Sequence, residues 1–208
     1  MRVGLLMISG MIFVLAGCGD TSSQVQSNIE TLEESSLQHE LQSLIDYEIE
    51  LQQDFETALS GEDLSNFSDA SAAVFSNIDS RSGTLDALTE KMATYEEAQE
   101  ELQNLSISED EAEMGDVVDS MTESLESVNG TMQSFLPQYE EVLNQERDYF
   151  NSLGESGAGY ETFKGGIEEL NEQHEEINDF YHTLDEAITD LNTNKNQLRE
   201  IINEEGDS

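Results

Sequence analysis

The chain has 208 residues, with 47 acidic against 7 basic side chains, and its formal net charge at pH 7 is −40. This charge excludes nucleic-acid binding, because recognition of phosphates needs a basic surface. A single cysteine excludes an internal disulfide, and the length suits one domain or one elongated helical bundle.

The first predicted element is a lipoprotein signal peptide over residues 1–17. A short positive start, Met1-Arg2, precedes an apolar run from Val3 to Leu15, which is the organisation of a secretory leader. As a helix this run spans about 20 Å, too little for the roughly 30 Å hydrocarbon core of a membrane. We therefore expect the leader to be removed rather than retained as a spanning helix.

Leu15-Ala16-Gly17-Cys18 reads as a bacterial lipobox, with cleavage between Gly17 and Cys18. Cys18 would carry an S-diacylglycerol and an N-acyl group, and acyl chains contribute about 0.8 kcal/mol per buried CH₂, so that two chains anchor stably. The predicted location is the outer face of the cytoplasmic membrane. Residues 18–24 would form a lipidated, flexible tether. The alternative is a cysteine that merely follows a cleavable leader.

Four apolar ladders with alternating spacings of four and three residues follow, and they predict a helical bundle over residues 25–204. The first, over 25–59, slips at Leu37, whereas the ladders over 67–102, 114–153 and 163–202 are regular. No alternating strand pattern is sustained. We predict an all-α fold, an elongated antiparallel four-helix up-and-down bundle with coiled-coil-like packing, and a disordered tail over 205–208.

Three turn signals separate the ladders. Ser60 to Asp63 contains a glycine stop and a capping aspartate, and residues 154–159 contain three glycines. In the break at 104–108, Ser108 and Glu111 have the spacing of a capping box. Helices of about 40 residues would be roughly 60 Å long. Since the middle break has no glycine, a two- or three-helix arrangement is the alternative.

Catalytic and metal-binding motifs are absent from this sequence. His39, His174 and His182 lack metal-ligand spacing, and His174 occupies a ladder position, where we expect a half-buried polar residue. We therefore predict no enzyme activity, no cofactor and no metal.

Four glycines, at positions 157, 159, 165 and 166, lack the preceding strand and the spacing of a phosphate loop. We interpret them as turn residues.

Three charged residues lie on ladder positions: Arg81, Glu146 and Lys195. We predict that Lys195 and Arg81 fix the helix register. Counting turns places Lys195 level with four carboxylates that could pair with it: Asp116, Asp119, Glu30 and Glu34.

The mature chain resembles the YkyA-like family of cell-wall-binding lipoproteins from Gram-positive bacteria. The resemblance rests on the lipobox that ends at Cys18, on the segments Leu51–Leu59 and Asn77–Arg81, and on the C-terminal stretch His174–Ile202. It implies a four-helix bundle tethered outside the cytoplasmic membrane, with no established enzyme activity. The acidity of this chain departs from the lysine-rich pattern of the family, which argues against electrostatic attraction to teichoic acids.

The sequence thus predicts a non-enzymatic surface lipoprotein that is anchored at Cys18. Its partners would be the membrane, through the lipid, and a cell-wall polymer or an envelope protein. Two alternatives are a coiled-coil spacer that oligomerises through a leftover apolar stripe, and a lipoprotein that binds a solute or a cation.

Overall fold

The computed structural model describes residues 21–60, 64–69 and 72–206. The predicted signal peptide, the cleavage site at Gly17 and the lipid attachment site at Cys18 lie outside these residues. So does Asp63, the predicted capping residue of the second ladder.

The described residues are almost entirely helical and contain no strand, so the all-α prediction is confirmed. The α-helices are α1 (Thr21–Glu34), α2 (Gln38–Leu59), α3 (Ala73–Gln103), α4 (Ala112–Leu153) and α5 (Tyr160–Gly206). Two 3₁₀-helices, η1 (Leu64–Ser68) and η2 (Glu109–Glu111), precede α3 and α4. Within the described part of the chain, no helix is both long enough and apolar enough to cross a membrane.

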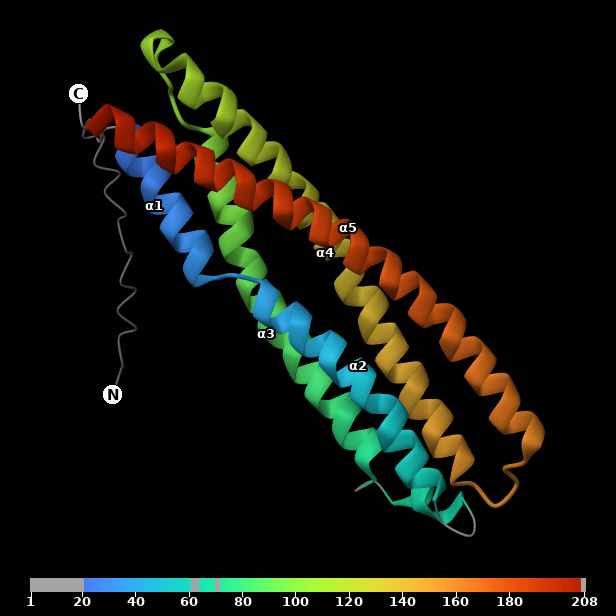
Figure 1. Cartoon of the computed structure of the whole chain (residues 1–208). Helices are drawn as coiled ribbons and strands as arrows, with labels where there is room; N and C mark the ends of the chain where they lie inside the picture. Colours follow the sequence, from blue (N-terminus) through green and yellow to red (C-terminus); the bar gives the residue numbers. More distant parts are fainter. Residues whose placement is uncertain (1–20, 61–63, 70–71, 207–208) are drawn as a thin grey trace, which may run out of the picture.

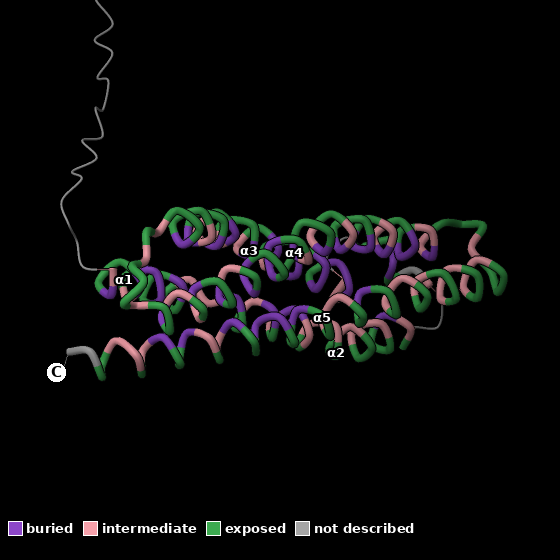
Figure 2. Tube along the Cα trace, turned by 90° about the horizontal axis from the view of Figure 1, so that it is seen from above, coloured by how far each residue is buried: buried purple, intermediate pink, exposed green. Residues whose placement is uncertain are grey.

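The helices form four antiparallel rods, the first of which consists of α1 followed by α2 (Figure 1). Heptad spacing directs one face of each rod inward, and the prediction is fully met in α4, where every ladder residue from Met114 to Leu153 is buried. Figure 2 shows buried residues along the inward faces of the rods. Both described chain ends lie at one end of the molecule, here called the terminal end, and η1 and residues 154–159 form the far end.

The middle break is a true chain reversal, because α3 ends at Gln103 and α4 begins at Ala112. The Ser108 backbone N–H donates to the Glu111 carboxylate at 3.2 Å, and the Ser108 side chain caps the Glu111 backbone N–H, which are the two contacts of the predicted capping box. The Ser108 hydroxyl also donates to the same carboxylate at 2.7 Å. The alternative with two or three helices is therefore wrong.

Several helix ends differ from the predicted ones. The first ladder is interrupted at residues 35–37, so that α1 and α2 are separate helices, and α1 already begins at Thr21, within the predicted tether. The second ladder was expected to be helical from Phe67, but Phe67 lies in η1 and α3 begins at Ala73. Phe67 is nevertheless buried, because η1 packs against the end of α4.

Two of the four glycines that were predicted to be turn residues lie inside a helix. Gly157 and Gly159 lie in the connection between α4 and α5, but Gly165 and Gly166 lie inside α5. Gly166 faces the Tyr149 ring, and a Cβ atom at this position would come within 2.1 Å of Tyr149 Cδ2. The glycine therefore allows a close approach of α4 and α5 rather than a turn.

The bundle is closed near the terminal end and open near the far end. α1 packs against both α3 and α5, whereas α2 packs against α3 and has no extensive backbone contact with α5. Accordingly, the ladder residues of α5 are buried at Ile177, Leu184 and Leu191 but only half-buried at Phe163, Ile167 and Leu170. The interruption at residues 35–37 separates these two regions.

Candidate functional site

A groove lies between α2 and α5 near the far end of the bundle, and side chains of α2, α4 and α5 line it. Its cavity has a volume of about 340 Å³, within the lower range of ligand-binding pockets. The residues that line it are Glu48, Leu51, Gln52 and Phe55 of α2, Tyr149 and Phe150 of α4, and Ile167, Leu170, Asn171 and His174 of α5. We call this surface the α2–α5 groove.

Aromatic side chains close the far end of the α2–α5 groove. The Phe55 ring lies 5.6 Å from the Phe150 ring and 6.0 Å from the Phe163 ring, both measured between ring centroids. The Phe67 ring of η1 lies 5.7 Å from Phe55. Phe55 of α2 thus contacts α4, α5 and η1 at once, and its ring sets the distance between the groove walls at this end.

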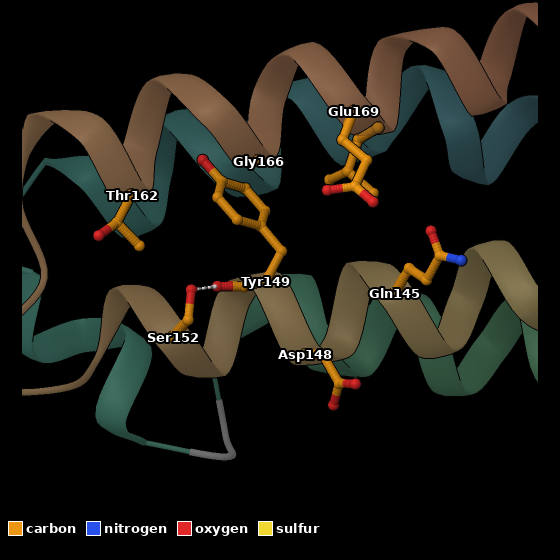
Figure 3. Close-up of a pocket in the computed structure, with 8 residues that line it drawn as sticks. Gln145, Asp148, Tyr149, Ser152, Thr162, Gly166 and Glu169 are labelled. Carbon is orange, nitrogen blue, oxygen red and sulfur yellow. Dashed lines mark hydrogen bonds between the residues drawn. The ribbon is translucent and has the colours of Figure 1, made fainter.

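Tyr149 separates the groove from a second cavity on the other side of the α4–α5 pair. That cavity, of about 340 Å³, is lined by Tyr149, Gly166 and Leu170 together with polar side chains such as Gln145 and Glu169. Figure 3 shows the Tyr149 ring crossing from α4 to α5 beside Gly166. The Tyr149 hydroxyl donates to the Phe163 carbonyl at 3.1 Å, and burial raises the pKa of this hydroxyl to about 12.

A buried polar network lies at the inner end of the groove. Arg81 of α3 and Glu146 of α4 form an ion pair whose side chains have no exposed surface. Arg81 Nη1 donates to Glu146 Oε1 at 3.1 Å, and His174 Nε2 of α5 lies 2.7 Å from the same oxygen. One carboxylate therefore joins three helices, and His174, which also lines the groove, connects the network to it.

The partners of Glu146 keep it ionised in spite of its burial. Burial alone would raise its pKa, but the hydrogen bonds and charges of His174 and Arg81 outweigh this effect and hold the pKa below the ordinary value. Burial likewise opposes the charge on Arg81, and the charge of Glu146 reverses that effect, so that the pKa of Arg81 is raised. The pair is charged at neutral pH.

Arg81 is also held from the side of α2. Its Nε atom donates to Asn77 Oδ1 at 2.8 Å, and Asn77 Nδ2 donates to the Tyr47 carbonyl at 2.8 Å and to Asp54 Oδ2 at 3.2 Å. The guanidinium thus connects α2 to the centre of the bundle through a single amide side chain.

Glu48 is the second carboxylate of the site and lies at the groove surface. Its Oε1 atom accepts hydrogen bonds from the Tyr139 hydroxyl at 2.6 Å and from the Tyr181 hydroxyl at 2.9 Å. Burial raises the pKa of both tyrosines, and the charge of Glu48 raises both further. Both hydroxyls therefore remain protonated donors, and the bond from Tyr181 bridges α2 and α5.

The predicted partners of Lys195 are wrong. Among the described residues, Lys195 forms no ion pair, although it is buried. Burial lowers its pKa, and the charge of Glu33 only partly opposes this. Glu33 is itself paired with Arg199, one turn further along α5. Counting helical turns predicts the position of Lys195 along the bundle axis. It does not predict which carboxylates on the neighbouring helices point toward Lys195.

The structure does not test whether Arg81 and Lys195 fix the helix register. Sequence patterning singled out Arg81, Glu146 and His174 as polar ladder residues, and all three meet in one network. It missed Glu48, which occupies the four-three position between Leu44 and Leu51 in the less regular first ladder, and Asn77, which lies off the second ladder. The described residues contain no group of three or more His, Cys, Asp or Glu side chains that could hold a metal ion.

Comparison with known proteins identifies the family. A family model described as "Putative cell-wall binding lipoprotein" matches residues 20–201. The chain belongs to the YkyA family. Because the family consists of lipoproteins, the YkyA-family chain is associated with the surface of the cell envelope. No curated protein and no solved structure shows a significant match to it.

Proposed function

We propose that this YkyA-family protein is a non-enzymatic lipoprotein of the outer face of the cytoplasmic membrane. An acylated Cys18 anchors it, and the helical rod holds the α2–α5 groove away from the lipid surface to bind a component of the cell wall or envelope. The observation that carries this proposal is that Cys18 precedes Thr21, the first residue of α1 and of the described part of the chain, by only three positions.

This short connection would keep the terminal end close to the membrane. Three residues span at most about 10 Å even when fully extended. α5 has 47 residues, which corresponds to a length of about 70 Å. With the rod upright on the membrane, the far end and the α2–α5 groove would lie well outside the headgroup region, within the zone of the cell wall.

The bonding of the acid and base groups supports a role without catalysis. Glu146 is occupied by Arg81 and His174, and Glu48 Oε1 is occupied by two tyrosine hydroxyls. A general base must reach a proton on the substrate, and Glu146 is fully buried between its partners. These groups are arranged to hold helices together.

The proposal is tested by fractionating cells that produce either the wild-type chain or a Cys18→Ser variant, with a Ser9→Ala variant as a control that leaves the lipobox intact. We expect wild type and Ser9→Ala to incorporate an alkyne-labelled fatty acid and to sediment with membranes. Cys18→Ser should lose the label and be released or remain unprocessed. Identical labelling and fractionation of all three would contradict the anchor. Photo-crosslinking of the wild-type protein in intact cells would then capture the envelope component that contacts it.

A further inference from the structure

We propose that the α2–α5 groove is a docking site for a basic peptide segment, with a lysine side chain laid along its apolar floor and the ammonium group on Glu48. This inference deepens the binding role proposed above by naming the chemistry of the partner. It does not depend on acylation of Cys18.

The floor of the groove suits the aliphatic part of a lysine side chain. Leu51, Phe55, Phe150, Ile167 and Leu170 line the cavity, and long cationic side chains bury their methylene stems on such surfaces while the charged head stays at a polar position. Aromatic faces add an attraction for a cation. The volume of about 340 Å³ accommodates one long side chain and its apolar neighbours.

Glu48 provides an acceptor for the ammonium group. Both hydrogen bonds from tyrosine hydroxyls go to its Oε1 atom, and its Oε2 atom accepts no hydrogen bond from the described residues. The side chain is half-buried and lines the groove. A partly desolvated carboxylate with one open oxygen forms a strong, charge-assisted hydrogen bond with an ammonium donor.

The rim of the groove is acidic. One turn from the lining residues, Glu56 follows Gln52 on α2, and Glu168 and Glu175 flank Asn171 on α5, so helical spacing places them on the same faces. All three are exposed. Lys164 lies near this rim, and its ammonium nitrogen is 3.4 Å from Glu168 Oε1. The net charge of the rim, like the −40 of the whole chain, favours a cationic occupant and opposes a second copy of this chain.

The test measures binding of a rhodamine-labelled peptide of alternating leucine and lysine by fluorescence anisotropy, at about 0.15 M salt, where long-range attraction between charges is screened. The full chain, purified in non-ionic detergent whatever the state of Cys18, is compared with protein-free micelles. A peptide with glutamine in place of lysine reports the contribution of the ammonium groups.

Three variants separate the site from diffuse attraction. Glu48→Gln keeps an acceptor for the tyrosines but removes the charge, and we expect about tenfold weaker binding. Gln52→Trp keeps every charge but fills the mouth of the groove, and it should weaken binding by a similar factor. Glu126→Gln removes an exposed carboxylate on α4 that does not line the groove, and it should leave the affinity within twofold. Circular dichroism verifies that each variant is folded.

The proposal is overturned if the lysine peptide does not bind, if the glutamine peptide binds equally well, or if Glu126→Gln weakens binding as much as Glu48→Gln. These outcomes are distinguishable from failure of the anchor, because fatty-acid labelling at Cys18 is measured separately and peptide binding does not require it.

Discussion

Arg81 on α3 and Glu146 on α4 form an ion pair with no exposed surface on either side chain, at the centre of a bundle whose chain is otherwise strongly acidic. The pair is the contact through which α2, α3, α4 and α5 are joined by polar side chains. Because both charges are removed from water, each depends on the other for its solvation.

Replacing Arg81 should therefore destabilise the fold strongly. Arg81→Met leaves Glu146 buried with only His174 as a partner, and loss of one member of a buried pair costs about 3 to 5 kcal/mol. The matched control is Arg147→Met, since the Arg147–Asp79 pair is exposed and should contribute about 0 to 1 kcal/mol. Urea unfolding measures both variants, and equal losses would contradict the central role of Arg81.

Lys195→Met should have the opposite effect. Lys195 is buried and its pKa is lowered by that burial, so the folded state bears a cost for keeping it charged. Replacing a buried lysine that has no ion pair by an apolar side chain of similar length removes this cost, so we expect an unchanged or higher melting temperature. A melting temperature that is unchanged or higher would also show that Lys195 does not fix the helix register. A clear drop would mean that attraction to Glu33 outweighs the cost of burial.

Two neighbouring glycines of α5 should respond in opposite ways to the same substitution. A Cβ atom at Gly166 would overlap the Tyr149 ring, whereas a Cβ atom at Gly165 would meet nothing within 4 Å. Gly166→Ala should destabilise by about 1 to 3 kcal/mol, the usual cost of overpacking. Gly165→Ala should stabilise by up to about 1 kcal/mol, because alanine favours a helix. Thermal unfolding measures both variants. Shifts of the two melting temperatures in the same direction would contradict the different packing of the two glycines.

The pH dependence of stability should include a contribution from Tyr149. Its pKa is raised to about 12 from an ordinary value of 10, so above pH 10 the unfolded chain loses a proton that the folded chain keeps. This stability is therefore complete below pH 10 and is lost as the pH rises toward 12.

Tyr149→Phe should make this alkaline loss smaller. At neutral pH the variant should also cost about 1 kcal/mol, because the hydrogen bond to the Phe163 carbonyl is lost. Urea unfolding at pH 8 and at several values above pH 10 measures both effects. The same alkaline loss in variant and wild type would exclude this role of Tyr149.

The ladder pattern predicted which face of each helix is buried, because a four-three spacing of apolar residues specifies one inward stripe. It did so fully for α4. It could not predict which rods touch along their whole length. The interruption at residues 35–37 contains neither glycine nor proline, yet it separates the part of the first rod that packs on α5 from the part that leaves the groove open.

The groove residues were harder to predict, because their roles depend on contacts between helices. Glu48 is held by hydrogen bonds from Tyr139 and Tyr181. These tyrosines belong to two other helices and lie about 90 and 130 residues away in the chain. The sequence alone suggests a turn at Gly166, whereas the structure shows that the Tyr149 ring packs against this glycine. Such features depend on contacts between helices, whereas a single sequence reports the pattern within each helix.

The orientation of the rod on the membrane can be measured directly by energy transfer. A single thiol is introduced at either end, as Ser106→Cys in the α3–α4 connection at the terminal end or as Gly157→Cys at the far end; both positions are exposed. With Cys18 acylated, each variant has one free thiol for a donor dye. The labelled proteins are reconstituted in vesicles that contain an acceptor lipid. A rod that stands on its terminal end should give strong energy transfer from Ser106→Cys and weak transfer from Gly157→Cys. Equal transfer from the two positions, or stronger transfer from Gly157→Cys, would contradict this orientation.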